Sequence, residues 1–201
     1  MCYLRRRIPR NDYKYLELQY FYIFIYMKIL TIFCSGKNGV RQEYLDEIKT
    51  LVNSFDTDKI TIAYGGGNVG LMGTVSDTYK AKGGKLITSN IKKFTVEGYP
   101  DDYIFDNITE RQSKLIELGD AFLALPGGFG TIYELLEVIT KNQIEEISKP
   151  IYIYNYKGIY DNLFRLIADL QNEGFVKHDL DWYKVRFFTD PKELINELNK
   201  N

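Results

Sequence analysis

The sequence predicts an α/β fold, namely a doubly wound parallel sheet with helices on both faces. From Lys28 onward, short apolar runs alternate with amphipathic helical patterns, as expected of a parallel α/β sheet. Two of the runs, 120–125 and 150–155, read as continuously apolar, which is typical of strands covered on both faces. The chain has 201 residues and carries no internal repeat or Pro/Ser-rich linker, which favours a single domain.

The individual elements follow from these patterns. The first strand, 28–34, is a short run rich in β-branched residues that ends at Ser35-Gly36. Further strands are expected over 59–63, 85–88, 102–105, 120–125, 150–155 and 185–188. Helices are expected over 40–54, 69–82, 108–119, 131–146, 159–173 and 190–199. Because such sheets bind ligands beyond the carboxyl ends of their strands, a site is expected in the loops that lead from strands into helices.

The overall composition excludes several classes of function. A formal net charge of −1 gives no reason to expect nucleic-acid binding by bulk electrostatics. One His and two Cys, Cys2 and Cys34, are too few for a zinc site built from those residues. Two Cys also argue against a disulfide scaffold, so a reducing compartment is expected. We therefore expect a cytoplasmic protein without a metal site, a nucleic-acid partner or a membrane partner.

The first 26 residues differ from the rest of the chain. They hold eight aromatic residues, and five basic residues against two acidic ones. The stretch Tyr20–Tyr26 resembles the apolar part of a secretory signal, but it is tyrosine-rich and lacks a small-residue cleavage site. The run from Tyr20 to Cys34 is also too short for a transmembrane helix, which needs about 20 apolar residues. We predict that 1–26 is an extension outside the domain and that 27–201 is the folded domain. We also predict that Met27 is the translation start.

A glycine-rich loop, YGGGNVGLMG over 64–73, follows the predicted strand 59–63 and opens a helix. Glycines permit a close approach by a ligand, and the amides of a helix N-terminus favour an anion such as phosphate. The alternative is a tight turn that serves only packing. The loop lacks the Gly-Lys-Ser/Thr of a P-loop, and the next strand ends without the acidic residue of a dinucleotide site. The candidate binding residues are Gly66, Gly67 and Asn68.

A second loop, LPGGFGTIYE over 125–134, follows the apolar strand 120–125. Its glycines and its hydroxyl at a helix start again suit an anion. Thr131 and Glu134 also match a capping box, in which the Glu only satisfies a backbone N–H. A carboxylate beside an anion site is electrostatically unfavourable, however, so the presence of Glu134 there suggests a role in a chemical reaction. The candidate phosphate-binding residues are Gly127, Gly128, Phe129, Gly130 and Thr131.

The helix before this loop supplies a basic residue. Asn107 and Glu110 match a second capping box, which puts Arg111 in the first turn and at the same strand ends. An Arg there can bind phosphate with two hydrogen bonds or hold a carboxylate in place. The alternative is a solvated surface Arg.

Together, these residues resemble the LONELY GUY (LOG) family of cytokinin riboside 5′-monophosphate phosphoribohydrolases, once labelled possible lysine decarboxylases. PGGFGTIYE at 126–134 matches the family's PGGxGTxxE, and 64–73 is similar to YGGGxxGLMG. The similarity runs from about Lys28 to Leu198. The family's M-x-x-R-K corresponds to 108–112, where Gln112 replaces the Lys. The segment before it is shorter than usual, and Glu97 stands in for a substrate-contacting glutamate.

The resemblance implies hydrolysis of the N-glycosidic bond of a nucleoside 5′-monophosphate, giving free base and ribose 5-phosphate. The substrate would be a cytokinin ribotide such as isopentenyladenosine monophosphate, or AMP. Glu134 would stabilise an oxocarbenium-like state while orienting or deprotonating water. Arg111 would orient Glu134 and contact the ribotide, and Thr131 with the amides of 128–131 would hold the phosphate. Thr140, farther along the helix, is carried over as a further contact.

The resemblance also implies a Rossmann-like domain without a metal or organic cofactor, and a homodimer or larger homo-oligomer in which the partner completes the pocket. The alternative is a non-catalytic binder, since related Rossmann-like proteins carry nucleotides or the molybdenum cofactor. Arg111 and Glu134 favour the enzyme, whereas Gln112 favours the binder.

Overall fold

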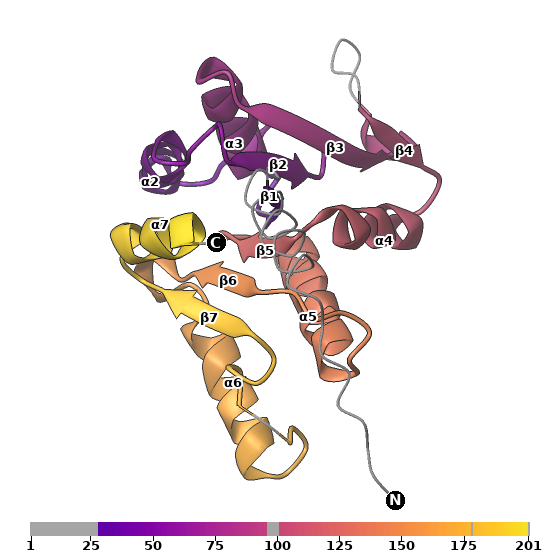
Figure 1. Ribbon diagram of the computed structural model, residues 1–201, viewed down its shortest axis with the longest axis vertical. Helices are drawn as coiled ribbons and strands as arrows, with labels where there is room; N and C mark the ends of the chain where they lie inside the picture. Colours follow the sequence, from indigo (N-terminus) through magenta and orange to yellow (C-terminus); the bar gives the residue numbers. More distant parts are fainter. Residues whose placement is uncertain (1–27, 96–100, 178, 201) are drawn as a thin grey trace, which may run out of the picture.

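The computed structural model describes residues 28–95, 101–177 and 179–200, which form one seven-stranded sheet flanked by helices (Figure 1). The strands are β1 (Lys28–Phe33), β2 (Ile60–Tyr64), β3 (Lys85–Ile91), β4 (Tyr103–Phe105), β5 (Ala121–Ala124), β6 (Ile151–Tyr154) and β7 (Val185–Phe188). The helices are α2 (Gln42–Asn53), α3 (Gly70–Ala81), α4 (Ile108–Leu118), α5 (Phe129–Gln143), α6 (Asp161–Asn172) and α7 (Pro191–Lys200). Two short 3₁₀ turns are η1 (Lys92–Phe94) and η2 (Tyr156–Gly158). Within these ranges, no helix is both long enough and apolar enough to cross a membrane. The predicted extension 1–26 lies outside the described residues.

All neighbouring strands of the sheet are parallel, in the order β4-β3-β2-β1-β5-β6-β7. The chain moves outward from β1 to β4, returns to the other side of β1 with β5, and moves outward again. The order therefore reverses between β1 and β5, where Leu30 pairs with Ala121 and Phe33 with Ala124. This arrangement confirms the predicted doubly wound sheet. Such sheets bind ligands at the carboxyl end of this reversal point.

An apolar core lies on each face of the sheet. Helices α2, α3 and α7 pack on one face, and α4, α5 and α6 cover the other (Figure 1). Helix α2 shows how the sequence directs this packing, because Tyr44, Ile48, Leu51 and Val52 recur on one helical face and are buried. Strands β5 and β6 are buried along their whole length, as their apolar sequences predict.

Two element boundaries differ from the predictions in ways that affect the site. Strand β3 continues beyond its predicted end at 88, because Ser89, Asn90 and Ile91 pair with β4. Helix α5 begins at Phe129 rather than at 131, so part of the second glycine loop is the first turn of this helix.

Candidate active site

Three loops meet at the carboxyl edge of the sheet, after β1, β2 and β5. The backbone ties them together, since Ser35 N–H donates to the Pro126 carbonyl at 3.2 Å and Met72 N–H to the Ser35 carbonyl at 3.1 Å. Gly70 has a φ of +61°, and a Cβ there would lie 2.4 Å from the Lys37 carbonyl oxygen, so only glycine fits. Both glycine-rich loops are therefore fixed against the loop that follows β1.

The N-terminus of α5 presents amide groups to this edge. Its N-cap is Gly128, and Ile132 N–H donates to the Gly128 carbonyl at 3.0 Å as the first helical bond. The N–H groups of 129–131 therefore have no partner within the helix. A Cβ at Gly127 would lie 2.0 Å from Thr131 Oγ1, so this glycine lets the hydroxyl approach the loop. The structure thus brings together, in a geometry that suits an anion, the predicted residues Gly127, Gly128, Phe129, Gly130 and Thr131.

Arg111 and Glu134 form a buried ion pair next to this helix N-terminus. Nη1 of Arg111 donates to Oε1 of Glu134, and the two residues are only 8% and 5% exposed. Nε of Arg111 donates to the Ser89 carbonyl at 3.0 Å, which fixes the guanidinium plane. The fold therefore joins the two residues that the sequence named as catalytic, and Arg111 is not a solvated surface residue.

Burial has the largest effect on the pKa of Glu134 and raises it above its ordinary value of 4.5. Arg111 opposes this shift of the pKa, and the neighbouring Glu137 adds to it. A carboxylate of this kind binds a proton more tightly than a free one while Arg111 still stabilises its anion, and both properties suit a general base. Cys34, at the end of β1, is buried nearby, and burial raises the pKa of its thiol so that it stays protonated.

Of the two predicted capping boxes, the structure forms the cap at Asn107 and not the one at Thr131. Asn107 caps α4, and its Oδ1 accepts from Glu110 N–H at 2.9 Å, which places Arg111 near the start of that helix. The second box is wrong, because α5 starts at Phe129 and its cap residue has no side chain. Glu134 therefore lies beyond the first turn of α5 and pairs with Arg111 rather than with the backbone.

Similarity to known proteins decides the family. The family model described as "Possible lysine decarboxylase" matches residues 72–198. Cytokinin riboside 5′-monophosphate phosphoribohydrolase LOG5 of Arabidopsis thaliana is 35% identical over 178 residues, covering 85% of this chain and 77% of that protein. Probable cytokinin riboside 5′-monophosphate phosphoribohydrolase LOGL2 of Oryza sativa subsp. japonica is 34% identical over 175 residues, covering 84% and 71%. The chain belongs to the LOG family.

The fold of this LOG-family chain also occurs in proteins of different description. The molybdenum cofactor binding protein of Rippkaea orientalis has a TM-score of 0.63 at 20% identity, covering 88% of this chain and 98% of that one. At this identity the similarity shows a common fold and no more.

In the LOG-type first loop, two glycines make room for polar side chains. A Cβ at Gly65 would lie 2.0 Å from Arg111 Nη2, and a Cβ at Gly66 would lie 2.2 Å from Asp101 Oδ1. These two positions therefore contribute to the site through the side chains that they admit.

The rest of the same loop packs against α3. A Cβ at Gly67 would lie 2.8 Å from Met72 Sδ, and one at Gly73 would lie 2.5 Å from the Asn68 carbonyl oxygen. These contacts support the packing alternative for the second half of the loop. Ligand contacts from Gly66, Gly67 and Asn68 remain predictions.

The other predicted residues lie in different places. Gln112, where the LOG pattern has lysine, is fully buried, with Oε1 3.5 Å from Arg111 Nη1 and with no partner for Nε2 among the described residues. Thr140 is exposed, and its hydroxyl donates to the Leu136 carbonyl at 2.8 Å. It lies nine positions after Thr131, about 13.5 Å along the helix, and a ligand contact from Thr140 remains a prediction. Glu97 lies outside the described residues.

Sequence reasoning missed Asp101, Asn90 and Ser89. Ser89 anchors Arg111 through its carbonyl, and Asn90 Nδ2 donates to Asp101 Oδ2 at 3.0 Å. The available indication was the polar run 88–90, which interrupts the apolar residues of this strand. Its buried side chains lie where β3 reaches the carboxyl edge.

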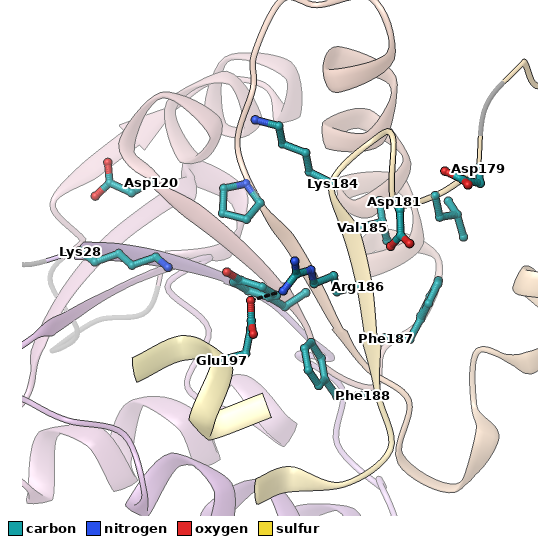
Figure 2. A pocket seen from close by; sticks show the side chains of 13 residues that line it. Lys28, Asp120, Asp179, Asp181, Lys184, Val185, Arg186, Phe187, Phe188 and Glu197 are labelled. Carbon is teal, nitrogen blue, oxygen red and sulfur yellow. Dashed lines mark hydrogen bonds and ion pairs between the residues drawn. The ribbon is translucent and has the colours of Figure 1, made fainter. Parts of the chain in front are cut away.

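A separate groove lies at the opposite, amino edge of the sheet. Its volume is about 1310 Å³, and it includes Lys28 and Val185, the first residues of β1 and β7 (Figure 2). Arg186 and Glu197 form an ion pair there. The groove carries both signs of charge and is far from Arg111, so it is not part of the anion site. In the part of the chain that the structure describes, no cluster of three or more His, Cys, Asp or Glu could hold a metal ion.

Proposed function

We propose that this chain hydrolyses the N-glycosidic bond of a nucleoside 5′-monophosphate, a cytokinin ribotide or AMP, and releases the free base and ribose 5-phosphate. The observation that carries the proposal is the buried Arg111–Glu134 pair beside the open N-terminus of α5. An anion site alone would bind a phosphate, but a buried carboxylate next to it only weakens that binding. The pair therefore has a role other than phosphate binding. Membership of the LOG family suggests a reaction that requires a buried carboxylate, namely hydrolysis of an N-glycosidic bond.

In the proposed reaction, the amides of 129–131 and the Thr131 hydroxyl bind the 5′-phosphate. This contact positions the ribose so that C1′ lies beside Glu134. Glu134 accepts a proton from water, whose oxygen attacks C1′ as the bond from C1′ to the base nitrogen breaks. The bonding electrons leave with the base, which takes up a proton. The negative charge of Glu134 stabilises the oxocarbenium-like state, and Arg111 holds the carboxylate in position.

A non-catalytic carrier is the alternative, since solved structures with this fold include a molybdenum cofactor binding protein. Gln112 in place of the family's lysine is the observation that favours it. A carrier has no use for a buried general base, however, and the fold buries an ion pair, at a cost in desolvation, to hold Glu134. We therefore rank hydrolysis first.

We further propose that the protein is a cytoplasmic homodimer in which the second copy covers the exposed side of α5. Phe129 follows the N-cap of this helix and is 92% exposed. An aromatic ring in water at the entrance to a site is unfavourable, and burial against a partner removes that cost.

The deciding experiment incubates the purified full chain with isopentenyladenosine monophosphate, with AMP, and with the two corresponding nucleosides. Free base, separated by chromatography, is expected from the monophosphates and not from the nucleosides, because the phosphate anchors the substrate. Glu134→Gln keeps the shape of the side chain and removes the base, so it should release no base above background. Full turnover by Glu134→Gln would contradict the mechanism. Tight binding of the monophosphates without base release would favour the carrier.

A further inference from the structure

Asp101, which lies shortly before β4, contacts the first glycine loop. A Cβ at Gly66 would lie 2.2 Å from Asp101 Oδ1 and 2.9 Å from Asn90 Nδ2, and Gly66 has a φ of +75°. Any side chain at position 66 would therefore displace this carboxylate, and glycine leaves room for it. Asp101 also lies close enough to Arg111 for the guanidinium to lower the pKa of its carboxyl, although burial is the larger effect and raises it. Asp101 and the ion pair thus belong to one site.

Asn90 holds one of the two carboxylate oxygens of Asp101. Its Nδ2 donates to Asp101 Oδ2 at 3.0 Å and to the Phe94 carbonyl at 3.2 Å. Its Oδ1 accepts from Ile91 N–H at 2.9 Å, so both ends of the amide are fixed. Oδ2 of Asp101 accepts from Asn90, and the Thr88 side chain also hydrogen-bonds to the Asp101 carboxyl. Oδ1 lies against Gly66 of the first glycine loop.

The order of the strands places Asp101 at the far end of the site from the anion-binding amides. These amides follow β5, beside β1, while Gly65 after β2 lies over Arg111, and Asn90 belongs to β3. Neighbouring strands are about 4.8 Å apart. A nucleotide whose phosphate binds at α5 and whose C1′ lies at Glu134 would extend its base toward Asp101. The charges agree, because a carboxylate repels phosphate and attracts an N–H group.

We propose that Asp101 selects the base, with its Oδ1 accepting an N–H from the exocyclic amine of a 6-aminopurine nucleotide. This inference rests on the proposed function, since it assigns the base end of the same substrate. An amine that carries one substituent keeps one N–H and is still accepted. A 6-oxopurine instead turns a carbonyl oxygen toward the carboxylate, and this pair of acceptors is disfavoured. A hydrogen bond to a charged group corresponds to a preference of about 10- to 100-fold.

The test compares AMP with IMP, which differ at this position of the base. For the full chain, kcat/KM for base release and Kd from calorimetry are measured for both nucleotides. The wild-type protein should prefer AMP by about 10- to 100-fold. In Asp101→Asn, Asn90 Nδ2 still needs an acceptor, so the new amide oxygen takes the place of Oδ2. The new amide N–H then takes the place of Oδ1 and faces the base as a donor, so the preference should fall by a similar factor or reverse.

Asp102→Asn is the matched control. Asp102 Oδ2 accepts from Thr88 N–H at 2.7 Å and from the Thr88 hydroxyl at 3.0 Å, and an amide oxygen can accept both bonds. This variant removes the same charge from the neighbouring residue. It should leave the ratio of kcat/KM for AMP to kcat/KM for IMP unchanged.

Each outcome decides the proposal. Equal use of AMP and IMP by the wild-type protein, or an unchanged ratio in a folded Asp101→Asn, overturns the role of Asp101 while the hydrolysis stands. If the wild-type protein releases base from neither nucleotide, the proposed function fails, and the ratio of the two Kd values then tests Asp101 in the same way. Should Asp101→Asn not fold, the same ratio is measured in Asp101→Ala, which lacks Oδ1, and an unchanged ratio there overturns the role of Asp101.

Discussion

Gly65 lies directly against the guanidinium of Arg111, because a Cβ at position 65 would lie 2.0 Å from Arg111 Nη2. The same guanidinium bonds to Glu134 through Nη1 and to the Ser89 carbonyl through Nε. The first glycine loop therefore contributes to the proposed catalysis by admitting the residue that holds Glu134.

Gly65→Ala should lower activity far more than stability. The atom that the new methyl group meets belongs to a side chain rather than to the backbone, so the loop keeps its place and the guanidinium shifts slightly while it stays next to Glu134. Its bond to Glu134 would then be misplaced by about an ångström, an error that can reduce turnover about 100-fold. Base release and urea unfolding, measured on the same preparation, separate the two effects.

Gly83→Ala is the control with the opposite expectation. Gly83 is exposed, has a φ of +78° and has no atom within 4 Å of its Cβ position. Alanine there should cost about 1 kcal/mol of stability through its backbone conformation and leave turnover unchanged. If Gly65→Ala keeps full activity, the contact between loop and guanidinium has no catalytic role.

The Arg111–Glu134 pair should show strong coupling in stability. Arg111→Met leaves Glu134 buried without its partner, and breaking such a pair costs about 3–5 kcal/mol. Adding Glu134→Leu removes the unpaired charge, so the double variant should unfold at a higher urea concentration than Arg111→Met alone. A double variant that shows the full sum of the two single losses would mean that the side chains are not coupled. Neither single variant nor the double variant should release base.

The acid limb of the pH profile should report Glu134. The carboxylate must be ionised to accept a proton from water, so activity falls as pH drops through its pKa. Because burial raises that pKa, the midpoint should lie above 4.5. Arg111 and Glu137 are the charged groups that act on it, and Glu137 raises the pKa. In Glu137→Gln the midpoint of kcat/KM against pH should therefore move to lower pH.

Glu145→Gln, an exposed change just after α5, should leave that midpoint where it is. A midpoint that does not respond to Glu137→Gln would assign the acid limb to a group other than Glu134.

The element order was predictable because it follows from local rules, whereas the interaction of Arg111 with Glu134 was expected from the resemblance to the LOG family. Strands such as β5 and β6 are marked by apolar runs, and glycines mark the loops that follow strands. In a parallel sheet the carboxyl ends of all strands lie at one edge. Arg111, near the start of α4, and Glu134, in α5, were therefore expected at the same edge although 23 positions separate them, and the resemblance to the LOG family implied that Arg111 orients Glu134.

The errors concern features that local rules do not determine. The start of α5 at Phe129 depends on how the loop packs, because the residues before Thr131 include three glycines and read as a turn. The position of Asp101 depends on a contact with Gly66, 35 residues earlier, which no periodicity encodes.

The exposed side of α5 supplies a prediction about assembly. Phe129, Tyr133, Leu136 and Ile144 follow at helical spacing, and all four are exposed, Leu136 to 40%. An apolar stripe along a helix that begins at the proposed site suits contact with a second copy. Leu136→Lys should therefore shift the protein toward monomer in light scattering, because a charge in a buried interface is costly.

Leu166→Lys on α6 is the matched control, since Leu166 is also an exposed leucine, at 54%, but lies outside this stripe. Its oligomeric state should equal that of the unmodified chain. If the partner completes the site, base release by Leu136→Lys should rise with protein concentration as dimers re-form, whereas specific activity of Leu166→Lys should stay constant. A chain that is monomeric and fully active before any substitution would overturn the assignment of this stripe, because α5 would then work with its apolar side in water.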